Sequence, residues 1–208
     1  DMLNRLIGAA QARSVGSAII CGQKRVGKTS IARALESHLK RLGYIVVYLE
    51  GGDYAEPNST ATICRLGDQL CKTISFCEQR ATHVPIPIFN EALSPIVEYL
   101  NEVLRVIPEI KIFFILDEFD ELPIDLYMRG AVGDAFFLTL RSISSRQRVG
   151  FVVVGSEKMA HVLDCQGDKL NKWNVFQVDY FTREMDWTDY CDLIRRPVMD
   201  ELDYTESS

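Results

Sequence analysis

The sequence lacks the long apolar run, the cysteine pairs and the histidine clusters that mark membrane, secreted and zinc-binding proteins. Its longest strongly apolar stretch, 110–116, is interrupted by Lys111, whereas a membrane-spanning helix needs about 20 apolar residues. The three histidines and six cysteines are scattered, and no C-x-x-C pair occurs. The N-terminus shows no secretory signal. We therefore expect a cytoplasmic protein with reduced cysteines and no membrane partner.

An excess of basic charge is also missing. The chain contains 23 Lys and Arg against 29 Asp and Glu, which gives a formal net charge of −6. Proteins that bind nucleic acids usually present a basic surface, so DNA is not indicated as a partner, although local basic patches would still permit it. With 208 residues, 47% of them hydrophobic, the chain is long enough for one α/β domain with a full core.

One short motif carries the strongest functional signal. Residues 22–29 read GQKRVGKT, which fits the G-x-x-x-x-G-K-[ST] pattern of phosphate-binding loops. Its glycines allow backbone angles that turn N–H groups towards a phosphate, Lys28 would neutralise the β- and γ-phosphates, and Thr29 would ligate magnesium. An apolar run precedes it and an amphipathic stretch follows it, which favours this function over an ordinary glycine-rich turn. The candidate nucleotide-binding residues are Gly22, Gln23, Lys24, Arg25, Val26, Gly27, Lys28, Thr29 and Ser30.

A second motif is the apolar run 112–116, which ends in Asp117 and Glu118. A buried strand of this kind would deliver both acids to the carboxyl edge of the sheet, where ligands gather in open α/β sheets. We expect Asp117 to hold magnesium together with Thr29. Glu118 is the candidate catalytic base, and Lys28 the second catalytic residue. Many strands end in acids, but a phosphate loop in the same chain favours the functional interpretation.

Other signals are weaker. Ser156 follows an apolar run, where this class often places a group that senses the γ-phosphate, and a simple turn explains it equally well. Pro197 would press on an adenine ring and Arg196 would reach the phosphates, but both also suit a helix end with a basic cap. Asp120 and Glu121 are expected to lie in a solvated loop or to contact a partner rather than to catalyse.

Strand-like and helix-like segments alternate along the chain, which predicts a parallel sheet covered on both faces. The expected strands are 18–21, 44–49, 110–116, 150–154 and 175–181. The expected helices are 30–42, 59–77, 95–106, 131–144, 157–163 and 183–195.

The order of the motifs resembles that of the STAND ATPases of the AAA+ superfamily, in the prokaryotic branch that is similar to origin-recognition ATPases. The resemblance covers about residues 4–198 and rests on GQKRVGKTSI, FFILDEFDEL, FVVVGSEKM, VDYFTREM and DLIRRPV. It implies an α/β P-loop fold, a three-layer α/β/α sandwich whose parallel five-stranded sheet has the order 5-1-4-3-2, with ATP/ADP and Mg²⁺ as cofactors. It also implies an ATPase core at 1–198, with 199–208 beginning a C-terminal segment that is cut off. Relatives often place an arginine finger near Arg146 or Arg148, which are otherwise ordinary surface arginines.

Three functions fit these motifs. The first is a slow, regulatory ATPase switch in a larger signalling or defence protein, which self-associates when ATP-bound and responds to an unknown sensed ligand; this is what the resemblance implies. The second is a DNA-binding ATPase of the initiator or loader kind. The third is a small-molecule kinase, which an acid directly after Asp117 disfavours because Glu118 suits water activation better. No guanine-reading motif occurs, which favours ATP over GTP.

Overall fold

The computed structural model describes residues 2–12 and 15–179, and its centre is a parallel sheet. The five strands are β1 (Ser17–Gly22), β2 (Ile45–Glu50), β3 (Ile112–Asp117), β4 (Val149–Gly155) and β5 (Asn174–Val178). They are arranged in the order β2-β3-β4-β1-β5, and every neighbouring pair is parallel. Read from the other edge, this is the expected order 5-1-4-3-2, so the predicted α/β P-loop fold is confirmed.

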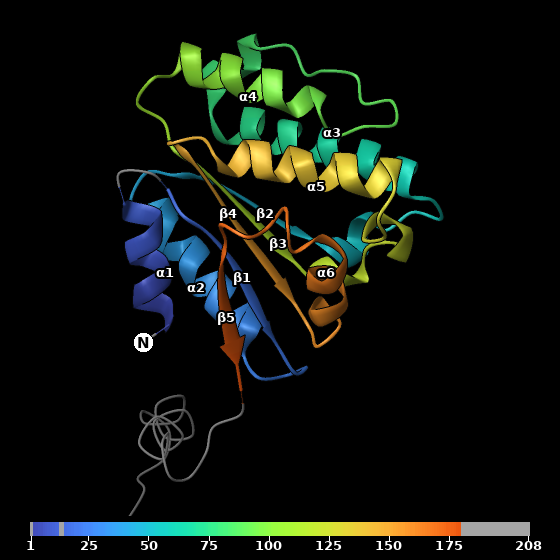
Figure 1. Cartoon of the computed structure of the whole chain (residues 1–208). Coiled ribbons are helices and arrows are strands. Elements are labelled where there is room, and N and C mark those ends of the chain that lie inside the picture. The colour runs from blue at the N-terminus through green and yellow to red at the C-terminus, as the bar shows by residue number, and fades with distance from the viewer. Residues whose placement is uncertain (1, 13–14, 180–208) are drawn as a thin grey trace, which may run out of the picture. The chain divides into compact units, whose positions relative to one another are not determined.

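Helices cover both faces of the sheet, as Figure 1 shows. On one side lie α1 (Met2–Gln11) and α2 (Lys28–Arg41); on the other lie α3 (Ser59–Cys77), α4 (Pro95–Val106) and α5 (Ala131–Ser144). The short helix α6 (Met159–Gln166) follows β4. None of the helices in the described part of the chain is long and apolar enough to cross a membrane.

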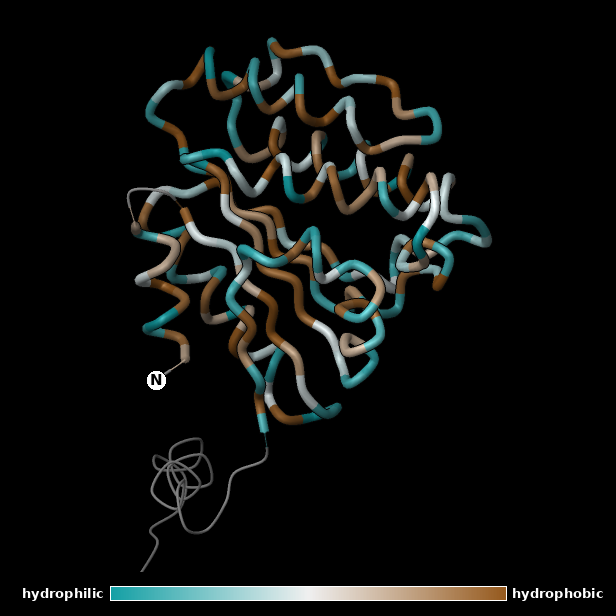
Figure 2. The backbone as a smooth tube through the Cα atoms, viewed as in Figure 1, coloured by the Kyte–Doolittle hydropathy of each residue, from teal (hydrophilic) through white to brown (hydrophobic). Residues whose placement is uncertain are grey.

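Two hydrophobic cores fill the spaces between these layers. Successive side chains of a strand point to opposite faces of the sheet. In β3, Phe113 and Ile115 therefore join the core under α1 and α2, whereas Phe114 and Leu116 join the core under α3, α4 and α5. Figure 2 shows the strands as mostly hydrophobic. This double burial explains why β1 to β4 read as apolar runs in the sequence, whereas the edge strand β5 buries only Phe176 and Val178.

Some element boundaries differ from the predictions. The second strand starts after Tyr44, whose N–H is bonded to the carbonyl of Leu39 at the end of α2. The third starts only at Ile112, since the N–H of Ile110 closes a turn onto Ile107. Helix α1 had no counterpart among the expected helices, and α6 begins two residues later than expected and extends to Gln166. The last two residues of the expected fifth strand and the expected helix 183–195 lie outside the described residues.

Candidate functional site

The glycine-rich loop connects β1 to α2 at the carboxyl edge of the sheet. Gly22 has φ +152°, and a Cβ there would lie 2.0 Å from the carbonyl oxygen of Val178, its neighbour on β5. Gly27 has φ +91° and precedes the first residue of α2. Glycine alone adopts such angles without strain, so the two fixed glycines of the motif are explained by the backbone they occupy. The loop ends at a helix N-terminus, which favours anions.

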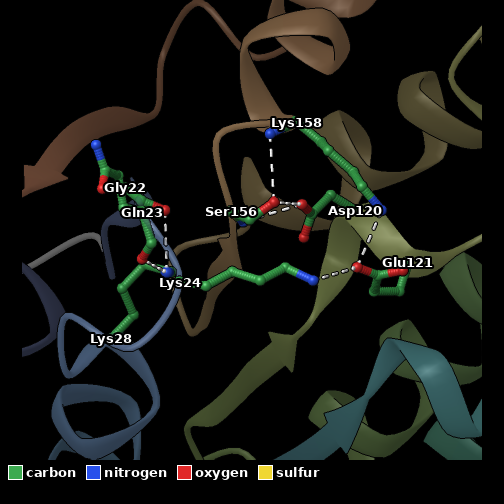
Figure 3. A network of polar contacts seen from close by, with 8 residues as sticks. All are labelled: Gly22, Gln23, Lys24, Lys28, Asp120, Glu121, Ser156 and Lys158. Carbon is green, nitrogen blue, oxygen red and sulfur yellow. Dashed lines mark hydrogen bonds and ion pairs between the residues drawn. The ribbon is translucent and has the colours of Figure 1, made fainter.

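Lys28 is the first residue of α2, and its ammonium group lies inside the loop. The side chain is buried, and Nζ donates to the carbonyl oxygens of Gly22 (3.0 Å) and Gln23 (2.5 Å), as Figure 3 shows. A cation is thereby held at the centre of the loop. The other loop residues point outwards or are half-buried, namely Gln23, Lys24, Arg25 and Val26. Thr29 and Ser30 are exposed in the first turn of α2.

Asp117, the last residue of β3, is 3% exposed and has a protein donor on each carboxylate oxygen. Its Oδ1 accepts the N–H of Glu118 at 2.9 Å, and its Oδ2 accepts the hydroxyl of Tyr48 at 2.6 Å. Each oxygen keeps a second lone pair for a further partner. The buried carboxylate of Asp117 is therefore fixed in orientation, and each of its oxygens can still accept a further partner.

Tyr48 is a site residue that the sequence analysis missed. It lies on β2, the edge strand beside β3, and the guanidinium of Arg33 lies 3.5 Å from its ring centre. Arg33 is held there by an ion pair with Glu50 at 2.6 Å. Burial and then the hydrogen bond to Asp117 raise the pKa of Tyr48 far above its ordinary value, so the hydroxyl stays protonated and donates. Only the register between β2 and β3 reveals this contact.

Glu118 occupies the residue after β3 with φ +49°, a left-handed conformation that is uncommon for glutamate. The chain can turn there because Gly51 lies against it: a Cβ on Gly51 would be 2.5 Å from the carbonyl oxygen of Glu118. Partial burial, then the negative charge of Asp117 and further carboxylates, raise the pKa of the Glu118 carboxylate. A raised pKa at a left-handed residue in this position is typical of a functional carboxylate.

Asp120 was expected to lie in a solvated loop or to contact a partner. Its side chain is instead buried, because the residue is only 6% exposed. The chain turns back through a short 3-10 helix, Phe119–Glu121, which directs the carboxylate towards the end of β4. There Asp120 accepts both the N–H (2.9 Å) and the hydroxyl of Ser156. The Ser156 side chain, one candidate for sensing a phosphate, thus anchors the loop after β4 in this structure (Figure 3).

Glu121 joins the phosphate loop to the loop after β4. Its Oε1 lies 3.5 Å from Nζ of Lys24 and 3.0 Å from Nζ of Lys158 (Figure 3). The hydrogen bond to Lys158 and both positive charges lower the pKa of Glu121. Exposed ion pairs of this kind add little stability each. They matter for the geometry of the site, because the Glu121 carboxylate links the phosphate loop to the loop after β4.

The two candidate finger arginines lie at the other end of β4 and have partners within the domain. Arg148 donates to the carbonyl oxygens of Leu104 (2.9 Å) and Ile107 (3.3 Å), near the end of α4. Arg146 donates to the side chain of Asn101 and, at 2.6 Å, to the carbonyl oxygen of Ser142. The two remaining candidates, Arg196 and Pro197, lie outside the described residues.

Replacing Ser156 by alanine is expected to lower the free energy of unfolding by about 1–3 kcal/mol, because the buried Asp120 carboxylate loses one of its two donors. Chemical denaturation of the two proteins measures the difference. Ser145→Ala is the control, since that hydroxyl is exposed and bonded only to a nearby carbonyl; its effect should be within about 0.5 kcal/mol. Equal stability losses in both variants would contradict a structural role for the Ser156 hydroxyl.

The chain matches one protein family and resembles several solved structures. Residues 12–163 match the model of a family described as "AAA domain". Among curated proteins, none matches the chain. Solved structures that resemble it include Cdc6p from Pyrobaculum aerophilum, which has 21% sequence identity and a TM-score of 0.59. This match covers 93% of this chain and 48% of that chain.

Two further structures are similar. The Walker-type ATPase PABY2304 of Pyrococcus abyssi has 15% identity, a TM-score of 0.61, and coverage of 99% of this chain and 59% of that chain. Drosophila ORC, solved bound to GC-rich DNA and Cdc6, has 15% identity, a TM-score of 0.55, and coverage of 92% and 29% respectively. The chain thus spans between 29% and 59% of the length of these proteins. At such identities the likeness shows the fold.

Proposed function

The chain belongs to the AAA domain family, and on this premise we propose that it binds and hydrolyses ATP at the carboxyl edge of its sheet. One observation carries the proposal: the cation of Lys28 lies inside a positive-φ glycine loop, on the same edge of the sheet as a fixed buried carboxylate, Asp117, and the carboxylate of Glu118. This is the set of groups that phosphoryl transfer to water requires. The proposed extent of the ATPase core is 1–198.

In this proposal the loop residues 22–30 hold the phosphates, and Ser156, Arg196 and Pro197 are further candidate contacts. Carboxylate and hydroxyl oxygens are ligands that Mg²⁺ prefers, so the buried Asp117 and the exposed Thr29 fit the ion that the family typically uses. When bound, Mg²⁺ neutralises charge on the β- and γ-phosphates. Glu118 accepts a proton from the attacking water.

We further propose an initiator- or loader-type ATPase in preference to a signalling or defence switch. Support comes from the structural relatives, because one is Cdc6p and another, ORC, is bound to DNA and Cdc6. The association of ORC with Cdc6 also favours self-association of this domain or its assembly with a second protein. The net charge of −6 requires that any DNA contact be local rather than spread over the surface.

DNA-dependent turnover tests this choice. We expect duplex DNA to raise the rate of ATP hydrolysis by the full chain, and the gain to shrink as salt rises, because phosphate contacts release counterions. A switch would instead show turnover that rises with protein concentration and ignores DNA. That second outcome would overturn the initiator-type proposal and leave the ATPase proposal standing.

Tyr48→Phe should weaken the affinity for Mg²⁺ without disturbing the fold, because it removes only the hydroxyl that orients Asp117. We expect roughly ten-fold more Mg²⁺ to be needed for half-maximal binding of a fluorescent ATP analogue, the usual cost of losing a group that orients a metal ligand. Tyr54→Phe is the matched control, since the Tyr54 hydroxyl forms no hydrogen bond with any residue that the structure describes. An unchanged Mg²⁺ dependence in Tyr48→Phe would show that Tyr48 does not position Asp117.

A further inference from the structure

Nearly every lysine and arginine in the described part of the chain contacts an acid, a carbonyl, an amide or an aromatic ring. The side chains of three of them have no hydrogen bond, ion pair or ring contact with the described residues: Arg25, Arg141 and Lys172. Arg25 lies in the phosphate loop, where an anion is expected. The other two lie far from it in the fold, and they line the same pocket.

This pocket, of about 560 Å³, is at the amino edge of the sheet. It lies where β1 begins, where α5 ends and just before β5 begins, so it is at the opposite end of the strands from the phosphate loop. Its lining also includes Trp173 and the serine residues Ser142, Ser144 and Ser145. None of the described residues that line it is an aspartate or glutamate, although acids outnumber bases in the chain.

The surroundings add donors and positive charge. Arg146 donates to the carbonyl oxygen of Ser142 at 2.6 Å and places its guanidinium beside the pocket. Trp173 is buried, with its indole N–H bonded to Ser144, so the floor of the pocket is fixed. One carboxylate, Glu98, lines a neighbouring groove that shares Leu138 and Ser142 with the pocket. Cations that have no partner lose no existing contact when an anion binds.

We propose that this pocket is a second anion site, which binds a backbone phosphate of nucleic acid through Arg141 and Lys172. The inference rests on the proposed initiator-type function and gives it a contact surface. It resolves the conflict between DNA binding and a net charge of −6, because a local cationic pocket without acids lets a polyanion approach. Trp173 is too buried to stack on a base, so the contact is to phosphate and carries no sequence preference.

The test is DNA binding by the full chain carrying Arg141→Gln and Lys172→Gln together. Fluorescence anisotropy with a labelled duplex is measured over a range of salt concentrations, with inorganic phosphate as a competitor in a separate series. We expect roughly ten-fold weaker binding and a log–log salt slope smaller in magnitude by about 2, one for each lost phosphate contact. The control pair, Lys40→Gln and Arg41→Gln on α2, removes the same charge elsewhere and should change binding less than about two-fold.

The possible outcomes distinguish a failure of the pocket assignment from a failure of the proposed initiator-type function. If the wild-type chain binds DNA and both pairs weaken it equally, the pocket is not the contact, and the initiator-type function stands. If the wild-type chain does not bind DNA at any salt concentration, that function and this assignment both fail. If inorganic phosphate at low concentration competes as well as DNA does, the site binds free phosphate rather than nucleic acid. Unchanged ATP binding and thermal unfolding confirm that each variant is folded.

Discussion

Lys28→Ala is expected to abolish ATP binding. The ammonium group lies at the centre of the glycine loop and would exchange its two carbonyl partners for β- and γ-phosphate oxygens. A hydrogen bond to a charged group contributes about 1.5–3 kcal/mol, so the loss of two such bonds predicts binding at least about 100-fold weaker. Titration calorimetry with ATP and Mg²⁺ measures the effect.

Lys24→Ala is the matched control for this result. Lys24 belongs to the same loop, but its side chain is 67% exposed and points to Glu121 at 3.5 Å. An exposed ion pair contributes at most about 1 kcal/mol, so ATP binding should change by a few-fold. Normal binding by Lys28→Ala, with thermal unfolding unchanged, would overturn the assignment of the phosphate loop. Equal losses in both variants would mean that general charge, and not the position of Lys28, governs binding.

The fold and the central motifs could be predicted because their signals are local. Gly22 and Gly27 mark positive-φ positions within eight residues of sequence, and an apolar run that ends in Asp117 marks a buried strand with an acid at its end. Strands β1 to β4 are buried on both faces and read directly as apolar runs, whereas the edge strand β5 buries only Phe176 and Val178. The strand order came from the resemblance to a known superfamily and could not have been worked out from these runs alone.

The contacts that were missed all depend on tertiary structure. Tyr48 reaches Asp117 only because β2 and β3 pair in a register that sets Glu50 beside Asp117. Asp120 was expected in solvent because it follows a strand in an acidic stretch, yet the turn after Glu118 directs it to Ser156 across the sheet edge. Such contacts join residues 36 and 69 positions apart, and no local pattern encodes them.

The same limitation applies to the cationic pocket. Arg141 and Lys172 are unremarkable in sequence, and Arg146 and Arg148 stood out instead because of their place before a strand. In the structure, the side chains of Arg146 and Arg148 are hydrogen-bonded within the domain, whereas those of Arg141 and Lys172 contact no charged or polar partner among the described residues. The absence of an internal partner, rather than position along the chain, distinguishes a cation that is available to a ligand.

Glu118→Gln is expected to leave ATP binding intact and to reduce turnover by a factor of about 10²–10⁴, the usual contribution of a general base. Glutamine keeps the size and polarity of the side chain but cannot accept the proton of the attacking water. The control is Glu121→Gln, which removes a nearby carboxylate that is paired with Lys24 and Lys158; its turnover should fall by only a few-fold. Binding and steady-state hydrolysis, measured on the same preparations, separate the two effects.

The pH dependence of turnover provides an independent check. The base acts only when deprotonated, and partial burial with the charge of Asp117 raises the pKa of Glu118 above its ordinary value. Turnover by the wild-type chain should therefore fall as pH is lowered through that raised pKa, and it should fall at a higher pH than for an ordinary glutamate. Glu121→Gln would preserve this acidic limb, whereas the residual turnover of Glu118→Gln should lack it. A limb that persists in Glu118→Gln would assign the catalytic proton to another group.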